Sequence, residues 1–440
     1  MANTKLTKTF ASDSNRKTWT WSAWIKRSGL GGIQTLMTQV DGWSGNGNAG
    51  FYIIGDQLTS YNLTASLNSG TDSYNRPSRY LRDVNGFYHI VVRLDTTQST
   101  ASNRCRWYVN GEQLTDFVYA NYPSLNQDCN FNGGDPHGIG SHTTGTGNYF
   151  DGIMSHVHFA DGQSLEPTVF GSTDSTTGEW TININPTFTL GTHGFTILKD
   201  GNTITDQSSN SNDWSLSGGT LTKTEDCPDN VFATLNGILQ TNEILSNGNT
   251  SANSASATWS YVATTIGVSS GKWYAEFLCS GAANTFMHGV TDLQYATRQG
   301  GYIGAATIAR GVGYLSINGS SYIDDTTSGY GASYVVGDII GCALDMDNNK
   351  VYFSKNGVWQ NSGDPTSGAT GTGALSLPTT GTYGFGTSNK DDSTTRANFG
   401  NGYFGTTAVS SAGTNASGNG IFEYDVPTGY TALSTKGLNL

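Results

Sequence analysis

The hydrophobic pattern of the chain alternates with period two in many short segments. The segment KTWTWSAWIKRS (17–28) places apolar side chains on one face and mostly polar side chains on the other. The apolar face holds Trp19, Trp21, Ala23 and Ile25, while Trp24 falls on the second face. This alternation predicts a half-buried β-strand. Similar patterns predict further strands within 50–63, 86–97, 105–114 and 150–163.

The strand pattern starts again after residue 246. Strands are predicted within GKWYAEFLC (271–279) and VGYLSINGSSYI (312–323), and residues 336–359 read as three strands of a meander that turns at 347–349 and at 355–357. A last apolar segment, GIFEYDVPTGYTAL (420–433), is expected to close this part of the fold. No long helix is predicted, and EPTVFG (166–171) is typical of a single helical turn.

The stretch between these two parts is more polar and has few apolar runs. It is predicted to be a partly ordered connector, with a strand or two within 179–201. The chain is therefore predicted to be all-β. Two antiparallel, jelly-roll-like β-sandwiches are expected at residues 1–171 and 247–440, joined by a connector over 172–246.

Two Asn-Gly pairs support this division. Asn110-Gly111 and Asn356-Gly357 each follow an aromatic strand, and both positions of a type I′ turn require a positive φ, which Asn and Gly tolerate best. Each pair therefore predicts a hairpin inside its own sheet. Two independent sandwiches explain why the same short pattern occurs twice.

Composition excludes several classes of function. Only 13% of the 440 residues are charged, 58 are Gly, and the aromatic residues favour strands over helices. The net charge is −12 and the largest basic cluster is SNRK (14–17), so no nucleic-acid partner is expected. No apolar run approaches 18 residues, so no membrane insertion is expected.

The cysteines indicate neither a disulfide framework nor a zinc site. Their number is odd, and no pair has the CxxC spacing. They are Cys105, Cys129, Cys227, Cys279 and Cys342. Those within strand-like runs are expected to be buried free thiols. The chain is thus expected to be made in a reducing cytosol.

The carboxylates give no support for catalysis. Glycoside hydrolases need two carboxyl groups about 5 to 9.5 Å apart. On concanavalin A-like folds the pair often lies on one strand as ExDxxE. The seven Glu of this chain do not form that pattern, and there is no GxSxG motif. The sequence therefore predicts no catalytic residues and no enzyme.

Two motifs raise the question of a metal. His156 and His158 share one face of a predicted strand, but no third ligand is evident, so a solvated polar face is favoured over a metal site. Asp345, Asp347 and Asn349 resemble the start of an EF-hand loop. Lys350 replaces its obligatory Gly, so a turn is predicted there.

Aromatic residues in predicted loops are the candidate ligand contacts. Tyr and Trp offer large contact area to sugars at a low entropic cost. The alternative is that these rings pack over the sandwich ends or between subunits. The candidates are Trp43, Tyr122 and Tyr149 in the first part of the chain and Tyr295, Tyr302, Tyr322 and Tyr330 in the last part.

Several of these segments resemble known families. The first part resembles the concanavalin A-like/laminin G-like jelly roll through TWSAWIKRS, FYHIVVRLD, RWYVNGEQL and FDGIMSHVHFADGQSLEP. The last part is similar to a SPRY domain through SSGKWYAEF, GVGYLSING, the meander at 336–359, TTRANFGN and YDVPTGYTALST. The laminin G resemblance implies a single Ca²⁺ at a loop rim, which no sequence pattern assigns to numbered residues. No other cofactor is expected.

The connector resembles a linker of tailed-phage proteins. The similar segment is DQSSNSNDWSLSGGTLTKTEDCPDNVFATLN (206–236), which departs from the linker at Cys227, where Thr or Ser is usual. This resemblance implies a virion protein, in a tail or head fibre or decoration, that adheres to host surface glycans. It also implies other virion proteins as partners and a homo-oligomer, with a trimer favoured. A purely structural capsid cement protein and a polysaccharide depolymerase remain as alternatives.

Overall fold

The computed structural model describes residues 3–39, 49–61, 63, 73–142, 147–238, 242–296 and 300–440. The chain divides into two compact units, Met1–Lys223 (unit 1) and Thr224–Leu440 (unit 2). In the described residues nearly all regular structure is strand, and the helical segments are 3-10 helices of three to six residues. The prediction of an all-β fold with antiparallel sandwiches is thereby confirmed. Within these ranges no helix has the length and apolar character needed to cross a membrane.

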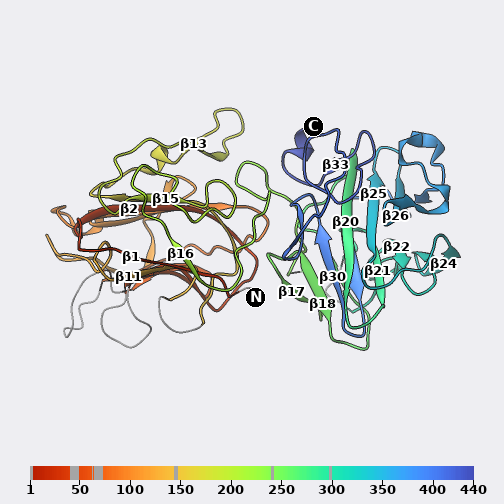
Figure 1. Cartoon of the computed structure of the whole chain (residues 1–440), viewed down its shortest axis with the longest axis horizontal. Coiled ribbons are helices and arrows are strands. Elements are labelled where there is room, and N and C mark those ends of the chain that lie inside the picture. The colour runs from red at the N-terminus through yellow and green to blue at the C-terminus, as the bar shows by residue number, and fades with distance from the viewer. Residues whose placement is uncertain are drawn as a thin grey trace. The chain divides into compact units, whose positions relative to one another are not determined.

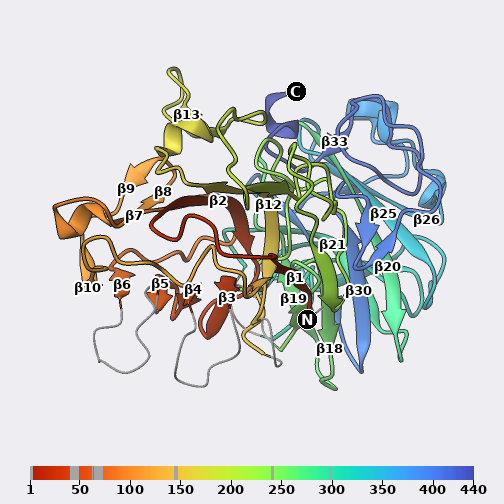
Figure 2. The same cartoon turned by 60° about the vertical axis from the view of Figure 1, so that its left-hand side comes forward.

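Two antiparallel sheets enclose the core of unit 1. The first runs in the order β10 (Phe117–Asn121), β6 (Tyr74–Pro77), β5 (Gln57–Tyr61), β4 (Ala49–Ile54), β3 (Ile33–Gln39), β11 (Pro136–Ile139), β1 (Lys5–Thr9) and β16 (Ser215–Gly218). The second runs in the order β15 (Phe195–Ile197), β12 (Gly152–Asp161), β2 (Thr18–Arg27), β7 (Tyr88–Asp95), β8 (Cys105–Val109) and β9 (Glu112–Gln113). Figure 2 shows β10 at the outer end of the first sheet.

Strand β2 has the predicted alternation, but it is not half-buried. Its inward face carries Trp19 and Trp21, which are fully buried in the core of unit 1. Its other face is buried as well, because the chain that follows β12 folds back over it. On this outer face Trp24 stacks on His89, with ring centroids 4.8 Å apart.

A small hairpin forms part of this cover. It consists of β13 (Gly171–Thr173) and β14 (Trp180–Ile182), which pair with each other. Trp180 lies parallel to His89, and its Nε1 donates a hydrogen bond to His89 Nδ1 at 3.0 Å. Phe170 and Phe188 add apolar contacts to the same outer face. We call residues 163–190 the unit 1 cover.

The segment expected as a connector is divided between the two units. β15 pairs with β12, and Trp214 is buried against the unit 1 core. β16 pairs with β1. From Thr224 onward the chain belongs to unit 2, where Phe232 is buried. A polar composition therefore coexists here with strands, because only a few apolar side chains anchor each stretch.

Unit 2 is also built from two sheets. The first runs in the order β17 (Ile244–Ser246), β18 (Ser251–Ser254), β30 (Ser393–Asn398), β20 (Lys272–Gly281), β25 (Ile339–Asp345), β26 (Lys350–Lys355) and β27 (Val358–Trp359), with β28 (Leu375–Ser376) on β26 and β33 (Thr431–Ala432) on β20. The second runs in the order β19 (Ser260–Ala263), β29 (Tyr383–Asn389), β21 (Phe286–Asp292), β22 (Gly311–Leu315), β23 (Ser320–Ile323) and β24 (Thr326–Gly329). Figure 1 shows β20, β25 and β26 as neighbours, and the predicted meander β25–β26–β27 is confirmed.

The C-terminal segment covers the outer face of the first sheet of unit 2. Phe422, Val426 and Tyr430 join a buried cluster with Tyr274 of β20. β33 pairs in parallel with β20. We call residues 401–434 the unit 2 cover. The last apolar segment thus packs on the sandwich, as its sequence pattern indicated.

The two Asn-Gly turns have the predicted backbone conformation. Asn110 and Gly111 have φ values of 50° and 77°, and Asn356 and Gly357 have 49° and 80°. In each turn an aromatic ring lies over the glycine. A Cβ on Gly111 would stand 2.4 Å from the Trp180 ring, and a Cβ on Gly357 would stand 2.6 Å from the ring of Tyr424. Both positions therefore require glycine for its conformation and for its lack of a side chain.

The five cysteines are free thiols, as expected. Four are buried, and Cys227 is half-buried. Burial raises the pKa of Cys105 to about 12, so this sulfur stays protonated and is a poor nucleophile.

Candidate binding site

The candidate aromatics of unit 1 have different surroundings. Trp43 lies outside the described residues. Tyr122 packs against the core beside Phe117, and burial raises the pKa of its hydroxyl. Tyr149 is half-buried in a segment without regular structure. The contacts of Tyr122 match the alternative of a packing role.

Two candidates of unit 2 lie together. The rings of Tyr302 and Tyr322 meet edge to face, with centroids 5.6 Å apart. The ring of Trp259, in the loop before β19, lies with its centroid 6.4 Å from that of Tyr302. The Tyr302 hydroxyl donates to Asp325 Oδ1 at 2.9 Å. Partial burial and this carboxylate raise the pKa of Tyr302 to about 12. Tyr322 lies in β23, not in a loop as predicted.

Tyr295 belongs to an ionic cluster on the same unit. The Arg310 guanidinium lies 5.5 Å from the Tyr295 ring and makes a two-pronged contact with Asp324, at 3.0 Å and 2.8 Å to Oδ2. Such a pairing fixes both the guanidinium and the ring. Tyr295 is 41% exposed, so part of its ring faces solvent.

Tyr330 lies in a loop, as predicted, but the residue is buried and not available to a ligand. The residue is 7% exposed, and its ring packs on Tyr314 and Phe353 in the core of unit 2. Its hydroxyl oxygen accepts a hydrogen bond from the backbone N–H of Phe353 at 3.0 Å. The reason is local. Strand β24 ends at Gly329, and the chain then turns inward against β22 and β26.

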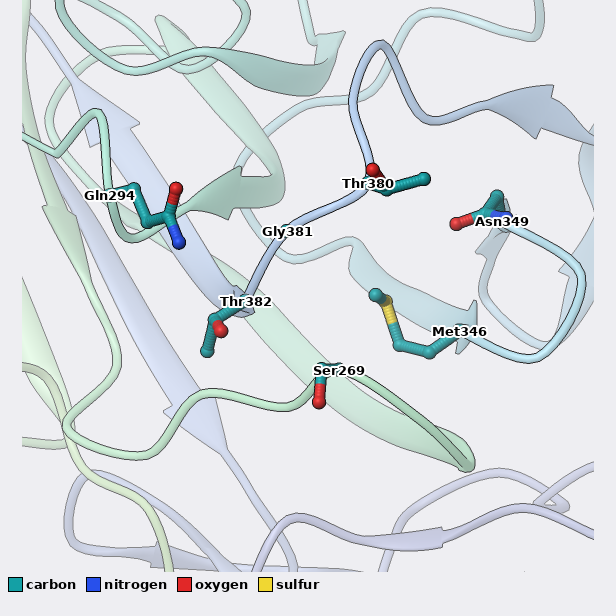
Figure 3. Close-up of a pocket in the computed structure, with 7 residues that line it drawn as sticks. All are labelled: Ser269, Gln294, Met346, Asn349, Thr380, Gly381 and Thr382. Carbon is teal, nitrogen blue, oxygen red and sulfur yellow. The ribbon is translucent and has the colours of Figure 1, made fainter.

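A pocket in unit 2 includes Gln294, the residue before Tyr295 in the chain. It encloses about 440 Å³ and opens to solvent. Its lining residues are Ser269, Gln294, Met346, Asn349, Thr380, Gly381 and Thr382. In Figure 3 the stretch Thr380–Thr382 passes between Gln294 and Met346. The pocket is therefore lined by side chains from separate loops.

Local structure explains how these loops are held. Gln294 follows β21, and its backbone N–H donates to buried Asp292 at 3.1 Å. The second oxygen of Asp292 accepts from the Thr379 hydroxyl at 3.0 Å. A Cβ on Gly381 would stand 2.2 Å from the same carboxylate. Asp292 therefore ties the β21 end to the 379–382 segment and leaves room only for glycine at 381.

The chemistry of the pocket walls is polar and uncharged. Hydroxyl and amide side chains supply hydrogen-bond donors and acceptors, and Met346 supplies an adaptable apolar surface. None of the lining residues carries a group that titrates near neutral pH. Such walls can hold a hydroxyl-rich or amide-rich ligand, and they carry no side chain that would act as an acid or base near neutral pH.

Sequence reasoning missed these lining residues. Ser, Thr, Gln and Asn in loops have no distinctive pattern, because the pocket exists only through the tertiary arrangement of four chain segments. The one available signal was the polar stretch PTTGT (378–382) before β29, whose glycine sits between two threonines.

The histidine pair is buried rather than solvated. His158 is 3% exposed and its Nδ1 lies 2.9 Å from Thr196 Oγ1. His156 has a φ of 50°, at an irregular register of β12 against β2, and contacts Ser155 Oγ at 2.7 Å. No set of three or more His, Cys, Asp or Glu suited to a metal occurs among the described residues. The expected solvated face is therefore wrong, since both residues are buried and the His158 ring packs on Phe170 and Phe188 of the unit 1 cover.

Two glutamates of unit 2 are buried and shifted. Glu276 accepts the backbone N–H groups of Glu423 and Tyr424, both at 2.8 Å. Glu243 accepts the Ser260 hydroxyl at 2.9 Å. Burial raises the pKa of each carboxyl to about 7. With exposures of 0% and 3%, these groups hold chain segments in place and do not face a substrate.

Comparisons with known proteins agree with this architecture. Residues 3–169 match the family model of the concanavalin A-like lectin/glucanases superfamily, in its laminin G type, and residues 272–378 match that of the SPRY domain. The chain therefore combines a concanavalin A-like domain with a SPRY domain. Together these domain types point to a non-catalytic role in binding carbohydrate or protein.

Several solved structures are similar to parts of the chain at low sequence identity. The SPRY domain of human HERC1 is 16% identical over 37% of this chain and 96% of that chain, with a TM-score of 0.29. The native heptameric SAP-like pentraxin from Limulus polyphemus is 16% identical over 37% of this chain and 71% of that chain, with a TM-score of 0.27. Stonustoxin is 17% identical over 38% of this chain and 27% of that chain, with a TM-score of 0.29. A search of curated proteins gives no match.

Proposed function

We propose that the protein binds a host surface glycan without cleaving it, and that unit 2 holds the glycan in the pocket lined by Gln294, Thr380 and Thr382. One observation carries this proposal. The pocket is lined by hydroxyl and amide groups with one thioether and has no titratable side chain. Sugar hydroxyls pair with such groups as donors and acceptors, and Met346 offers an apolar contact to the C–H face of a sugar.

The setting of this function is a tailed-phage virion. Support comes from the linker-like segment 206–236, which is similar to segments that join these two domain types in phage proteins. A fibre or decoration protein presents many copies of a weak site at once. Multivalent presentation raises the overall affinity without any new contact.

The test uses the full chain on an array of bacterial capsule and lipopolysaccharide oligosaccharides, followed by calorimetry on the bound ones. Gln294→Ala and Thr382→Val each remove polar contacts from the pocket wall. We expect each to weaken binding by about three- to tenfold, because a hydrogen bond contributes about 1 kcal/mol. Thr326→Val, an exposed threonine on β24, is the matched control and is expected to leave binding unchanged.

Other outcomes would replace the proposal. Binding that ignores both pocket variants would place the glycan site elsewhere on the chain. No binding, with particles that adsorb normally but lose physical stability without this protein, would favour the cement function. New reducing ends after incubation with polysaccharide would favour the depolymerase. Locating the chain in an electron-microscopy map of an intact particle tests the virion setting itself.

A further inference from the structure

The first sheet of unit 1 ends at an open strand edge. β10 is the terminal strand, paired only with β6 in the described part of the sheet, and Figure 2 shows it at the sheet's outer end. Its sequence, FVYAN, contains no charge. Val118 and Tyr119 are 49% and 54% exposed. An uncharged, apolar edge strand has backbone groups ready to pair with another strand, which most proteins prevent with charges or proline.

A stack of tyrosines crosses the sheet and stops at this edge. Tyr52 of β4, Tyr61 of β5, Tyr74 of β6 and Tyr119 of β10 lie on its outer face. Successive ring centroids are 5.9, 4.7 and 5.2 Å apart. Tyr52 is fully buried, and its ring lies over Gly50, where a Cβ would stand 2.1 Å away. The stack thus begins in packed surroundings and ends in an exposed ring.

The spacing of this stack follows the spacing of the strands, which is about 4.8 Å. The planes of Tyr61 and Tyr74 are tilted by only 32°, and those of Tyr74 and Tyr119 by 42°, so these neighbouring rings face one another. Each inner ring therefore has its faces covered by its neighbours in the stack. Only the outer face of Tyr119 is open. A further strand with a ring at the same height would continue both the sheet and the stack.

The tyrosine stack favours a second copy of this chain as the occupant, because the β10 of that copy presents its own Tyr119 at the same height. The net charge of −12 opposes association, but the uncharged β10 sequence keeps like charges out of the strand pairing itself. Arg76, the residue opposite Tyr119, reaches back across the sheet to the Ile54 carbonyl at 3.2 Å, away from the edge. The terminal strand of the other sheet of this unit, β9, differs because it carries Glu112, whose side chain is 66% exposed.

We propose that two copies pair edge to edge through β10, antiparallel and centred on Tyr119, so that the two tyrosine stacks join. An antiparallel self-pairing is isologous and closes at two copies.

The other end of this sheet, β16, is also uncharged and exposes Leu216 at 45%. Pairing of β10 with β16 would be head to tail and would not close. This inference does not rest on the proposed glycan function, although a dimer would double the number of sites.

The test measures the mass of the full chain by sedimentation equilibrium. The expected mass is twice 46.7 kDa. Tyr119→Lys places a charge at the centre of the contact, and we expect it to weaken dimerisation at least a hundredfold. Val358→Lys is the matched control, because Val358 is a 67% exposed apolar residue on the terminal strand β27 of unit 2. It is expected to leave the dimer intact, and both variants should fold, since both positions are exposed.

A covalent readout fixes the register. Tyr119→Cys places two thiols opposite each other in the proposed pairing, at a Cα separation that a disulfide spans. We expect it to form a cross-linked dimer under mild oxidation, while Val358→Cys stays monomeric on a denaturing gel. A monomeric wild type, a dimer that survives Tyr119→Lys, or a dimer broken instead by Leu216→Lys would each overturn the proposal. Loss of glycan binding with an intact dimer would contradict only the proposed function.

Discussion

The two units solve the same problem with different chemistry. In each, one strand of the sandwich, β2 or β20, is buried on both faces along most of its length, because a later segment of the chain covers its outer face. The unit 1 cover rests on aromatic stacking, with His89 between Trp24 and Trp180. The unit 2 cover rests on a buried carboxylate, because Glu276 accepts two of its backbone N–H groups.

The parallel extends to the turns. In both units the cover places an aromatic ring over the glycine of an Asn-Gly turn, Trp180 over Gly111 and Tyr424 over Gly357. The repeated Asn-Gly pattern therefore marks the place where each cover packs against a hairpin. The difference between the covers is electrostatic. Unit 1 keeps histidines neutral under its cover, whereas unit 2 buries acids.

The largest expected effect is a selective loss of unit 1 at low pH. Burial lowers the pKa of His89, His137 and His158 to about 3, from 6.5. Between these values the unfolded chain binds more protons than the folded one, so stability is complete above pH 6.5 and falls as the pH drops towards 3. Each histidine then lowers the free energy of unfolding by up to about 5 kcal/mol. The three contributions together exceed the stability of an ordinary domain.

Unit 2 should resist acid better. It has one histidine with a lowered pKa, His288. The raised pKa values of Glu243 and Glu276 mean that the folded unit 2 takes up protons as the pH falls below 7, which offsets the loss of stability that His288 causes. Unit 1 holds seven of the ten tryptophans, so tryptophan fluorescence reports mainly on its unfolding. Pepsin digestion at acidic pH should release fragments of unit 1 first. Simultaneous loss of both units, or earlier loss of unit 2, would contradict this difference.

The next effect concerns Glu276. Burial raises its pKa to about 7 from 4.5, so the folded state binds more protons in this interval. Its contribution therefore makes unit 2 less stable as the pH rises from 4.5 to 7, by about 3 kcal/mol at most. Glu276→Gln should flatten that part of the pH profile in chemical denaturation of unit 2. Glu112→Gln, an exposed carboxylate of unit 1, is the control and should not change the slope.

The covered glycines should show a smaller, paired effect. Gly111→Ala and Gly357→Ala each add a Cβ that collides with a ring at a positive φ. We expect a loss of about 2 kcal/mol in the free energy of unfolding for each. Gly178→Ala and Gly429→Ala have φ values of 76° and 87° with open space around the Cβ, and about 1 kcal/mol is expected. Equal losses at covered and open glycines would mean that the rings yield without cost.

The smallest effect is expected at the surface of unit 2. Tyr302→Phe removes the hydrogen bond to Asp325 but keeps the contacts with Tyr322. The expected loss is about 0.5 to 1 kcal/mol, because the site is partly solvated. The free energy of unfolding of the wild type and of Tyr302→Phe is compared by urea denaturation. A loss above about 2 kcal/mol would show that this cluster is a structural centre of unit 2, not a surface feature.

Much of the fold followed from the sequence. Period-two alternation located β2, β20 and the β25–β27 meander, and two Asn-Gly pairs gave the correct turns. The unit 1 cover could not be predicted, because residues 163–190 have little periodicity and gain their place only from long-range contacts. Of the unit 2 cover, only the apolar segment 420–433 was expected to pack on the sandwich. The same limit made β2 look half-buried and placed Tyr330 at the surface.

The candidate site was less predictable than the fold. Aromatic residues attracted attention because single rings are visible in a sequence, and two of them, Tyr302 and Tyr322, do lie together. The unit 2 pocket is lined mostly by polar, uncharged side chains from segments far apart in the chain. Their proximity depends on Asp292 and Gly381, whose roles appear only in three dimensions.

The central claim is that the unit 2 pocket binds a glycan and leaves it intact. Its most direct test incubates the full chain with an oligosaccharide that it binds, and then measures both the affinity and the chain length of the recovered sugar. The account predicts weaker binding for Gln294→Ala and an unchanged sugar length for every variant. Shortened chains from the wild type, or unchanged affinity in the pocket variants, would contradict it.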